Sequence, residues 1–408
     1  MRIGMMADIY KPHISGVTNY IELNKRYLEK AGQEVFVFTF GEDEYQDDEP
    51  NIIRSPSLPF LSPKGYGDIQ IGLRYDERAR RLLHTMDVVH VHHPIISMAT
   101  ALRHCKPRGI PIVFTHHSRY DLTAQAMLPL LPDGAGELFE KAYFPSLCQA
   151  VDLVVAPSPS IKEMLQRLGV DVHIEIIPHG VELTPFRENI QPLDRGNFGF
   201  KEEEILLIYV GRLSPEKNLP FLLRSFFGAV QAFPTLGLLL VGDGPEWDNL
   251  HDLASYMGLN DRIRFIGMVN YKDLPSYLTM ADIFVTPSTA ETFGLSVVEA
   301  MASGLPVLGI NTFGICDNIE DGVTGFLAPE DLASFTAKMV RLITDRGLRL
   351  QMGARARMAS DAYAIEKTVV VILDQYRRLL DQSSQKKQGL TSFLRRLFSS
   401  HTASQGKS

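Results

Sequence analysis

The chain has 408 residues, of which 45% are hydrophobic and 22% charged, and its formal net charge is −7. This length and composition are typical of a soluble globular protein with two domains. The acidic balance argues against nucleic-acid binding, and three scattered cysteines without a C-x-x-C spacing predict no disulfide framework.

From the amino-terminal sequence we expect no signal peptide, and from the whole sequence no membrane-spanning segment. An acidic residue, Asp8, comes too early for the apolar region of a signal peptide. No run of about eighteen apolar residues occurs anywhere, so no membrane-spanning helix is predicted. We therefore expect a cytoplasmic protein.

The first part of the chain alternates short apolar runs with helical patterns. One such pattern, GVTNYIELNKRYLEKAG, ends at Gly32, a typical helix C-cap. The apolar runs have the composition of buried parallel strands, and the alternation predicts a doubly wound α/β sheet. The predicted strands are IGMMAD (3–8), EVFVFTFG (34–41), DVVHVHHP (87–94), PIVFTHH (111–117), LVVAPSP (153–159) and IEIIPHGV (174–181).

A polar segment at 183–204 then separates this pattern from a second series of strands. These are ILLIYVG (205–211), LGLLLVG (236–242), IRFIGMV (263–269), DIFVTPS (282–288) and LPVLGI (305–310). The sequence thus predicts two Rossmann-like domains, residues 1–190 and 191–364. A ligand is expected between them, at the carboxyl ends of the strands.

Two motifs in the second domain predict a site for a nucleotide-sugar. In YVGRLSPEKN, the cations Arg212 and Lys217 follow a strand, as expected of a phosphate site. In ETFGLSVVEAM, a helix begins near Gly294, where free backbone N–H groups can receive a diphosphate. Glu291 and Glu299 would then bind hydroxyl groups on either side of it. Alternatively, Glu291 caps the turn and Glu299 pairs with a structural cation.

These residues carry a family resemblance. ETFGLSVVE, with GRLSPEKN upstream, resembles the retaining GT-B glycosyltransferases of family 4, as do VGDGPE, FIGMV, ADIFVTPS, AMASGLPV and DGVTGFLAP. The resemblance extends to about residue 380. It implies a GT-B fold, a nucleotide-sugar donor, retention through front-face attack, and neither a cofactor nor a metal ion.

The resemblance also implies roles for individual residues. Arg212 and Lys217 would neutralise the donor diphosphate, Glu299 would bind the ribose and Glu291 the transferred sugar. His116 would lie next to the anomeric centre. The remaining donor-binding positions implied are Gly16, Gly211, Val269, Phe293, Gly294 and Leu295. Where the family has Gly-Gly-Val, this chain has Ser-Gly-Val at 15–17.

The histidines of VHVHHP, namely His90, His92 and His93, suggest a metal site. No Cys, Asp or Glu completes a ligand set in this segment, so packing or hydrogen bonding is the favoured interpretation.

The acceptor is expected in the first domain. RYDLTAQAMLPLLPDG (119–134) contains apolar candidates that equally suit a core-packing loop, and Asp121 is a candidate polar contact. The acceptor candidates are Asp121, Met127, Leu128 and Leu131. The segment THHSRYD resembles family members that glucosylate diacylglycerol.

Basic residues point toward an anionic membrane surface. Two patches lie in the first domain: Arg78, Arg80 and Arg81, and Arg103, Lys106 and Arg108. A helix at 365–382 is expected to cross back to that domain. The following tail, 383–408, has no acidic residue, and its composition predicts disorder in solution. Helical spacing nevertheless gives it one apolar stripe, formed by Leu390, Phe393, Leu394, Leu397 and Phe398, so it is either an interfacial helix or a solvated tail.

Taken together, the sequence predicts a hexosyltransferase that moves glucose from UDP-glucose to a lipid such as diacylglycerol, at the cytoplasmic face of a membrane. Two alternatives remain. The same chemistry could serve a soluble or polysaccharide-linked acceptor, for instance with GDP-mannose as donor. A GT-B sugar-nucleotide epimerase is the alternative of another class.

Overall fold

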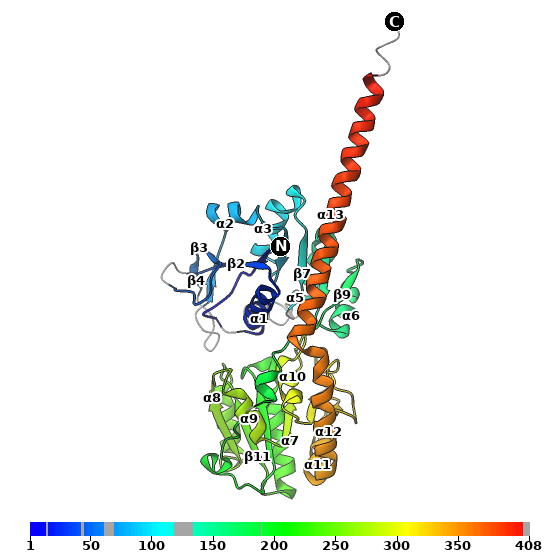
Figure 1. Ribbon diagram of the computed structural model, residues 1–408. Coiled ribbons are helices and arrows are strands. Elements are labelled where there is room, and N and C mark those ends of the chain that lie inside the picture. Colours follow the sequence, from blue (N-terminus) through cyan, green and yellow to red (C-terminus); the bar gives the residue numbers. More distant parts are fainter. Residues whose placement is uncertain (14, 42–44, 61–68, 118–133, 189, 403–408) are drawn as a thin grey trace.

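The computed structural model describes residues 1–13, 15–41, 45–60, 69–117, 134–188 and 190–402, which form two parallel β-sheets (Figure 1). The first sheet has seven strands in the order β3-β2-β1-β6-β7-β8-β9, and β4 and β5 form a separate antiparallel pair. The strands are β1 Arg2–Met6, β2 Glu34–Phe40, β3 Ile52–Ser55, β4 Leu58–Phe60, β5 Ile69–Ile71, β6 Val88–Val91, β7 Ile112–Thr115, β8 Leu153–Ala156 and β9 Ile174–Ile176.

The second sheet has six strands in the order β12-β11-β10-β13-β14-β15. Its strands are β10 Leu206–Val210, β11 Gly237–Val241, β12 Ile263–Gly267, β13 Ile283–Thr286, β14 Val307–Ile310 and β15 Gly325–Ala328. In both sheets the strand order reverses once, between β1 and β6 and between β10 and β13. These are the topological switch points where doubly wound folds bind ligands. The predicted pair of Rossmann-like domains is confirmed.

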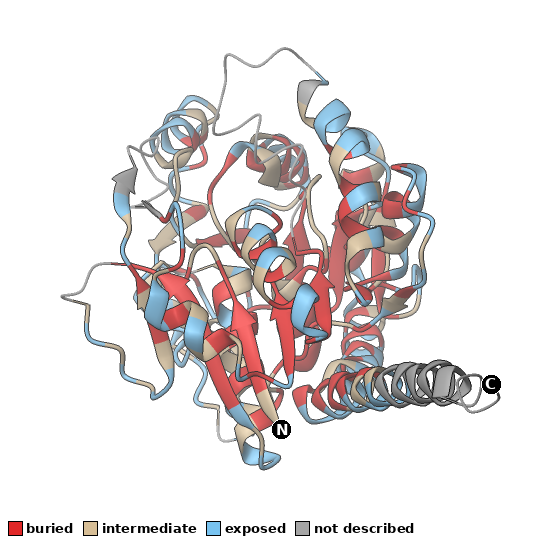
Figure 2. Ribbon diagram, turned by 90° about the horizontal axis from the view of Figure 1, so that it is seen from above, coloured by how far each residue is buried: buried red, intermediate tan, exposed pale blue. Residues whose placement is uncertain are grey.

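Helices cover both faces of each sheet, which explains the apolar strands. In β2, Phe36 and Phe38 pack into the core on one face, while Val35 and Val37 pack on the other. Strands of this kind lie almost entirely buried between the helices (Figure 2). The helices of the first domain are α1 Gly16–Lys30, α2 Glu77–Leu83, α3 Ile96–His104, α5 Ala135–Ala150 and α6 Pro159–Arg167. Those of the second are α7 Leu219–Ala232, α8 Trp247–Tyr256, α9 Leu274–Met280, α10 Leu295–Ala302, α11 Leu332–Thr344 and α12 Arg346–Ala359.

The last helix, α13 Ile365–Thr402, leaves the second domain and runs along the first (Figure 1). Ile365, Ile372 and Tyr376 enter the core formed with α1 and the first sheet. The backbone is helical through Thr402, whereas the sequence analysis expects disorder beyond Ser383. Within the described residues, none of the helices combines the length and the apolar character needed to cross a bilayer.

Tyr376 joins α13 to the first sheet through a hydrogen bond between its hydroxyl and His90 Nδ1, 2.6 Å apart. Both side chains are fully buried. We expect Tyr376→Phe to lower the free energy of unfolding by about 1–3 kcal/mol, because it leaves a buried polar nitrogen without its partner. Urea unfolding would measure this, with Tyr256→Phe as the control because Tyr256 is 90% exposed. Equal stability of the two variants would contradict the prediction.

Candidate functional site

Two helix N-termini, one from each domain, meet at the switch points. A Cβ atom added to Gly16, the first residue of α1, would lie 3.7 Å from Leu295 Cδ1 at the start of α10. The position before Gly16 is the N-cap Ser15, whose hydroxyl accepts a hydrogen bond from the Thr18 backbone N–H, 3.1 Å away. The serine that replaces the family's first glycine therefore has a structural role. Both helix dipoles favour a negative group between them.

We call the place where Gly16 of α1 approaches Leu295 of α10 the junction. Positive charge from the second domain reaches it. The pKa of His13, in the loop before α1, is lowered by burial and then by the nearby charge of Arg212. Arg212 follows β10, and its carbonyl accepts a hydrogen bond from the Tyr209 hydroxyl, 2.9 Å away. Gly211, between them, continues the strand pairing, because its N–H donates to the carbonyl of Val241.

The β13–α10 loop, residues 287–294, carries Glu291 against Lys217. The two side chains form an ion pair in which 17% of Lys217 and 21% of Glu291 remain exposed. Glu291 thus contacts a cation from the β10–α7 segment. Gly314 has φ +75°, and a Cβ there would come within 2.7 Å of the Glu291 carbonyl, so only glycine lets the two backbones approach. Gly294 is the N-cap of α10, with φ +73°.

Phe293 anchors this loop in the junction. Only 2% of the side chain is exposed. Its ring lies 5.2 Å from the His179 ring of the first domain and 5.4 Å from that of Tyr363, which precedes α13. Phe293 of the second domain therefore packs against both the first domain and the segment that leads into α13.

Glu299 is buried, and its partner is a hydroxyl group. The residue is 7% exposed, and burial raises the pKa of its carboxyl to about 7, while a hydrogen bond from Tyr271 opposes this shift. The Tyr271 ring lies 5.8 Å from that of Phe186 in the linker. Within the described chain, the alternative of a structural cation thus finds no support. The sequence analysis missed Tyr271, whose only signal is its place two residues after Val269.

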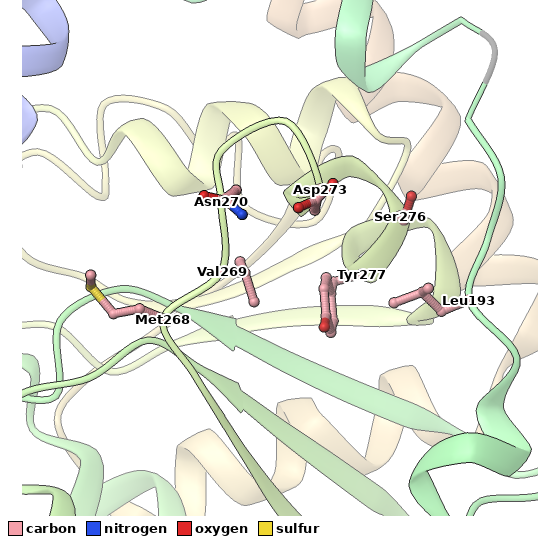
Figure 3. Close-up of a pocket in the computed structure, with 7 residues that line it drawn as sticks. All are labelled: Leu193, Met268, Val269, Asn270, Asp273, Ser276 and Tyr277. Atoms are coloured by element: carbon pink, nitrogen blue, oxygen red, sulfur yellow. The ribbon is translucent and has the colours of Figure 1, made fainter.

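Val269 lines an open cavity of about 360 Å³. Val269, Tyr277 and Leu193 approach this space from the β12–α9 loop, from α9 and from the linker (Figure 3). Of the predicted donor-binding residues, Val269 alone is among its lining residues.

His90 in β6 and His93 after it each bind protein groups. His90 Nε2 lies 2.6 Å from Thr115 Oγ1, and its Nδ1 binds Tyr376. His93 Nδ1 accepts a hydrogen bond from the Asp8 backbone N–H, 3.2 Å away. Across the described parts of the chain, no three ligating side chains are grouped as a metal site requires.

A chain of buried histidines approaches the junction. His92 Nδ1 lies 2.9 Å from His117 Nε2, and His117 Nδ1 lies 3.2 Å from His179 Nε2. Burial lowers the pKa of all three, that of His179 to about 3. They are therefore neutral near pH 7, which allows each ring to donate one hydrogen bond and accept another.

His116 and His117 point to opposite sides of the first sheet. The His116 ring is fully buried 5.1 Å from Phe144 of α5, on the side away from α1. The His117 ring lies 4.8 Å from Tyr20 of α1 and 5.0 Å from His179. The structure thus brings His117, and not the predicted His116, to the side where the helix N-termini meet. The two-residue periodicity of extended chain was the signal that could have separated them.

The predicted acceptor residues lie outside the described residues. Asp121, Met127, Leu128 and Leu131 all fall within 118–133.

Comparisons with known proteins find relatives for both domains. The family described as Glycosyltransferase Family 4 matches residues 14–184, and that described as Glycosyl transferases group 1 matches residues 191–359. An alpha-monoglucosyldiacylglycerol synthase of Acholeplasma laidlawii is 29% identical over 405 residues, 95% of this chain and 99% of the relative. One from Streptococcus pneumoniae (strain ATCC BAA-255 / R6) is 30% identical over 340 residues, 80% of this chain and 75% of the relative.

Solved structures show the same fold. Anabaena HepE in complex with UDP has a TM-score of 0.75 at 19% identity, covering 93% of this chain and 100% of that one. The predicted GT-B fold is confirmed.

The burial of Glu299 predicts a pH-dependent stability. Its pKa is about 7 in the folded chain against 4.5 ordinarily, so the native state keeps this proton to a higher pH than the unfolded chain does. The free energy of unfolding therefore falls as the pH rises from about 4.5 to about 7, by about 3 kcal/mol. Glu299→Gln removes the ionisable carboxyl and with it this loss of stability at high pH. We expect the variant to gain about 3 kcal/mol over wild type at pH 8 and nothing at pH 4.

Urea unfolding at both pH values would measure the difference, with the exposed Glu203→Gln as the control. A gain for Glu299→Gln that is equal at both pH values would contradict the prediction.

Proposed function

Because this chain belongs to the group 1 glycosyltransferases of family 4, we propose that it transfers glucose from UDP-glucose to diacylglycerol or a similar membrane lipid. The observation that carries this proposal is its similarity to two alpha-monoglucosyldiacylglycerol synthases, which extends through both domains. The first domain is included, and that is the domain expected to select the acceptor.

The junction supports a donor site for a nucleoside diphosphate sugar. The N-termini of α1 and α10 converge there, and Arg212 and Lys217 add positive charge to the same region. In our proposal these groups bind the diphosphate and stabilise the charge that develops as it leaves, which requires no metal ion. Lys217 then exchanges part of its contact with Glu291 for phosphate, which releases carboxylate oxygens to accept hydrogen bonds from the sugar.

Glu299 receives the ribose in this proposal. The pKa of its buried carboxyl lies near 7, and two ribose hydroxyls that donate to the carboxylate would favour the charged form. Val269 contacts the base. We assign to His117, in place of His116, the position beside the transferred sugar, because its ring packs on Tyr20 of α1 and its carbonyl accepts a hydrogen bond from Thr292 of the β13–α10 loop. The leaving diphosphate accepts the acceptor's proton in front-face attack.

A peripheral membrane location is also part of the proposal. The basic patch of Arg103, Lys106 and Arg108 is exposed, and Ser383 Oγ in α13 donates to the adjacent Gly109 carbonyl, 3.3 Å away. The start of the basic tail therefore lies beside this patch, and together they would attract anionic lipid. Leu138 and Phe139, at the start of α5, are 71% and 52% exposed and follow the segment that holds the predicted acceptor residues.

A transfer assay tests this function. Radiolabelled UDP-glucose is incubated with vesicles of diacylglycerol and an anionic lipid, and the full chain is compared with one that ends at Asp381. We expect label in the lipid fraction, and less of it without the tail. Label in lipid that does not depend on the tail would remove the tail's role. UDP binding without any labelled lipid, for a panel of donor sugars, would overturn the lipid acceptor and favour a soluble one.

The donor site has its own test. We expect Lys217→Ala and Glu291→Ala each to lower the transfer rate by about 100-fold or more, because each removes a fixed group that contacts the reacting sugar diphosphate. Lys338→Ala is a matched control, since Lys338 pairs with Asp321 elsewhere in the second domain and should keep wild-type activity. Near wild-type turnover of either site variant, with circular dichroism showing both folded, would contradict the donor assignment.

A further inference from the structure

We infer that Thr292 is a positioning residue, which holds the β13–α10 loop against the first domain and so sets the distance between Glu291 and the histidines that follow β7. This inference rests on the proposed function, because it assigns the geometry of that same donor site. Thr292 lies between Glu291, which pairs with Lys217, and Phe293, which packs on His179.

Two hydrogen bonds fasten Thr292 to the first domain. Its hydroxyl donates to the carbonyl of His117, with an Oγ1–O distance of 2.7 Å. Its own carbonyl accepts a hydrogen bond from the Ser158 hydroxyl, 3.2 Å away. His117 follows β7 and Ser158 follows β8, and these two strands are neighbours in the sheet. The loop is therefore held at two points along one sheet edge, which fixes its orientation as well as its distance.

The segment behind the loop is fastened to the same place. Asn318 Nδ2 donates to the Phe293 carbonyl, and the Gly314 backbone packs against that of Glu291. This segment also reaches the first domain, where the Ser160 hydroxyl bonds the Asp317 carboxylate and accepts from the Gly314 N–H, 3.0 Å away. The Asp317 carboxylate thus lies at the N-terminus of α6. The dipole of this helix favours a negative charge there. The segment that packs behind the β13–α10 loop is therefore itself bound to the first domain.

Among these contacts, the Thr292 hydroxyl has the most direct effect on the site. It connects the residue after Glu291 to His117, the proposed neighbour of the transferred sugar. Of the groups proposed to bind the diphosphate, Arg212, Lys217 and the N-terminus of α10 belong to the second domain, so this bond between the domains does not set their positions relative to one another. Loss of the hydroxyl should therefore disturb the sugar relative to the first domain while the nucleotide still binds.

Three variants test the inference. Thr292→Val keeps the side-chain shape and removes the hydroxyl, and Thr292→Ser restores the hydroxyl. Thr344→Val is the matched control, because Thr344 Oγ1 donates to the Val340 carbonyl, 2.9 Å away, in a helix remote from the junction. We expect Thr292→Val to lower kcat by about 10- to 100-fold, as misplacement of reacting groups does, with KM for UDP-glucose and Kd for UDP within about threefold of wild type.

Thr292→Ser should recover kcat to within about threefold of wild type, because serine keeps the hydroxyl that bonds the His117 carbonyl. Thr344→Val should not change kcat, because the hydrogen bond that it removes is remote from the site. Retained kcat in Thr292→Val, a rise in KM alone, or failure of Thr292→Ser to recover activity would each overturn the inference.

Hydrogen exchange of the peptide that covers 287–294 separates this inference from the proposed function. If wild type labels no lipid, the proposed acceptor fails, yet the loop can still be examined. Faster exchange of this peptide in Thr292→Val than in Thr292→Ser and Thr344→Val supports the inference. Equal exchange in all three variants overturns it, whatever the acceptor.

Discussion

All strands in each main sheet run parallel, so the loops that follow the strands gather at one edge, and in this protein the two edges face each other. The order of each sheet reverses beside its first strand, which leaves space for a helix N-terminus there. Gly16 and Leu295 begin the two helices concerned. Their approach brings backbone N–H groups of both domains to a common region, and the cations after β10 join them. The direction of the strands thus sets where the site lies, and the side chains then supply its charges.

The three titratable side chains Lys217, Glu291 and Glu299 each have a partner within the protein. Lys217 pairs with Glu291, and the Tyr271 hydroxyl bonds Glu299. Such partners limit the cost of burying charge, which is several kcal/mol for an isolated ion. They also hold the side chains in fixed directions. The phosphate oxygens and hydroxyls of a diphosphate sugar can replace these partners. Because the side chains are already held in place, binding does not have to order them.

Neutral polar contacts connect the crossover helix with the same region. Tyr376 of α13 bonds His90, and the neighbouring chain of His92, His117 and His179 ends against Phe293. Burial lowers the pKa of these histidines, so they contribute hydrogen bonds without charge. Charged imidazoles at these positions would repel one another. The polar interior of the first domain therefore remains compatible with a cationic site beside it.

Local patterns in the sequence were enough to predict the fold, and they supplied the candidate residues of the donor site. Apolar runs and helical periodicity are short-range properties, and the motifs around Arg212 and Glu291 carry their charges within a few residues. Tertiary structure decided the rest, because it depends on groups far apart in the chain. Thr292 meets His117 across 175 positions, and Tyr271 bonds Glu299 from another loop. Between the adjacent His116 and His117, side-chain direction alone decides which one reaches the junction, and the packing of α1 and α5 sets that direction.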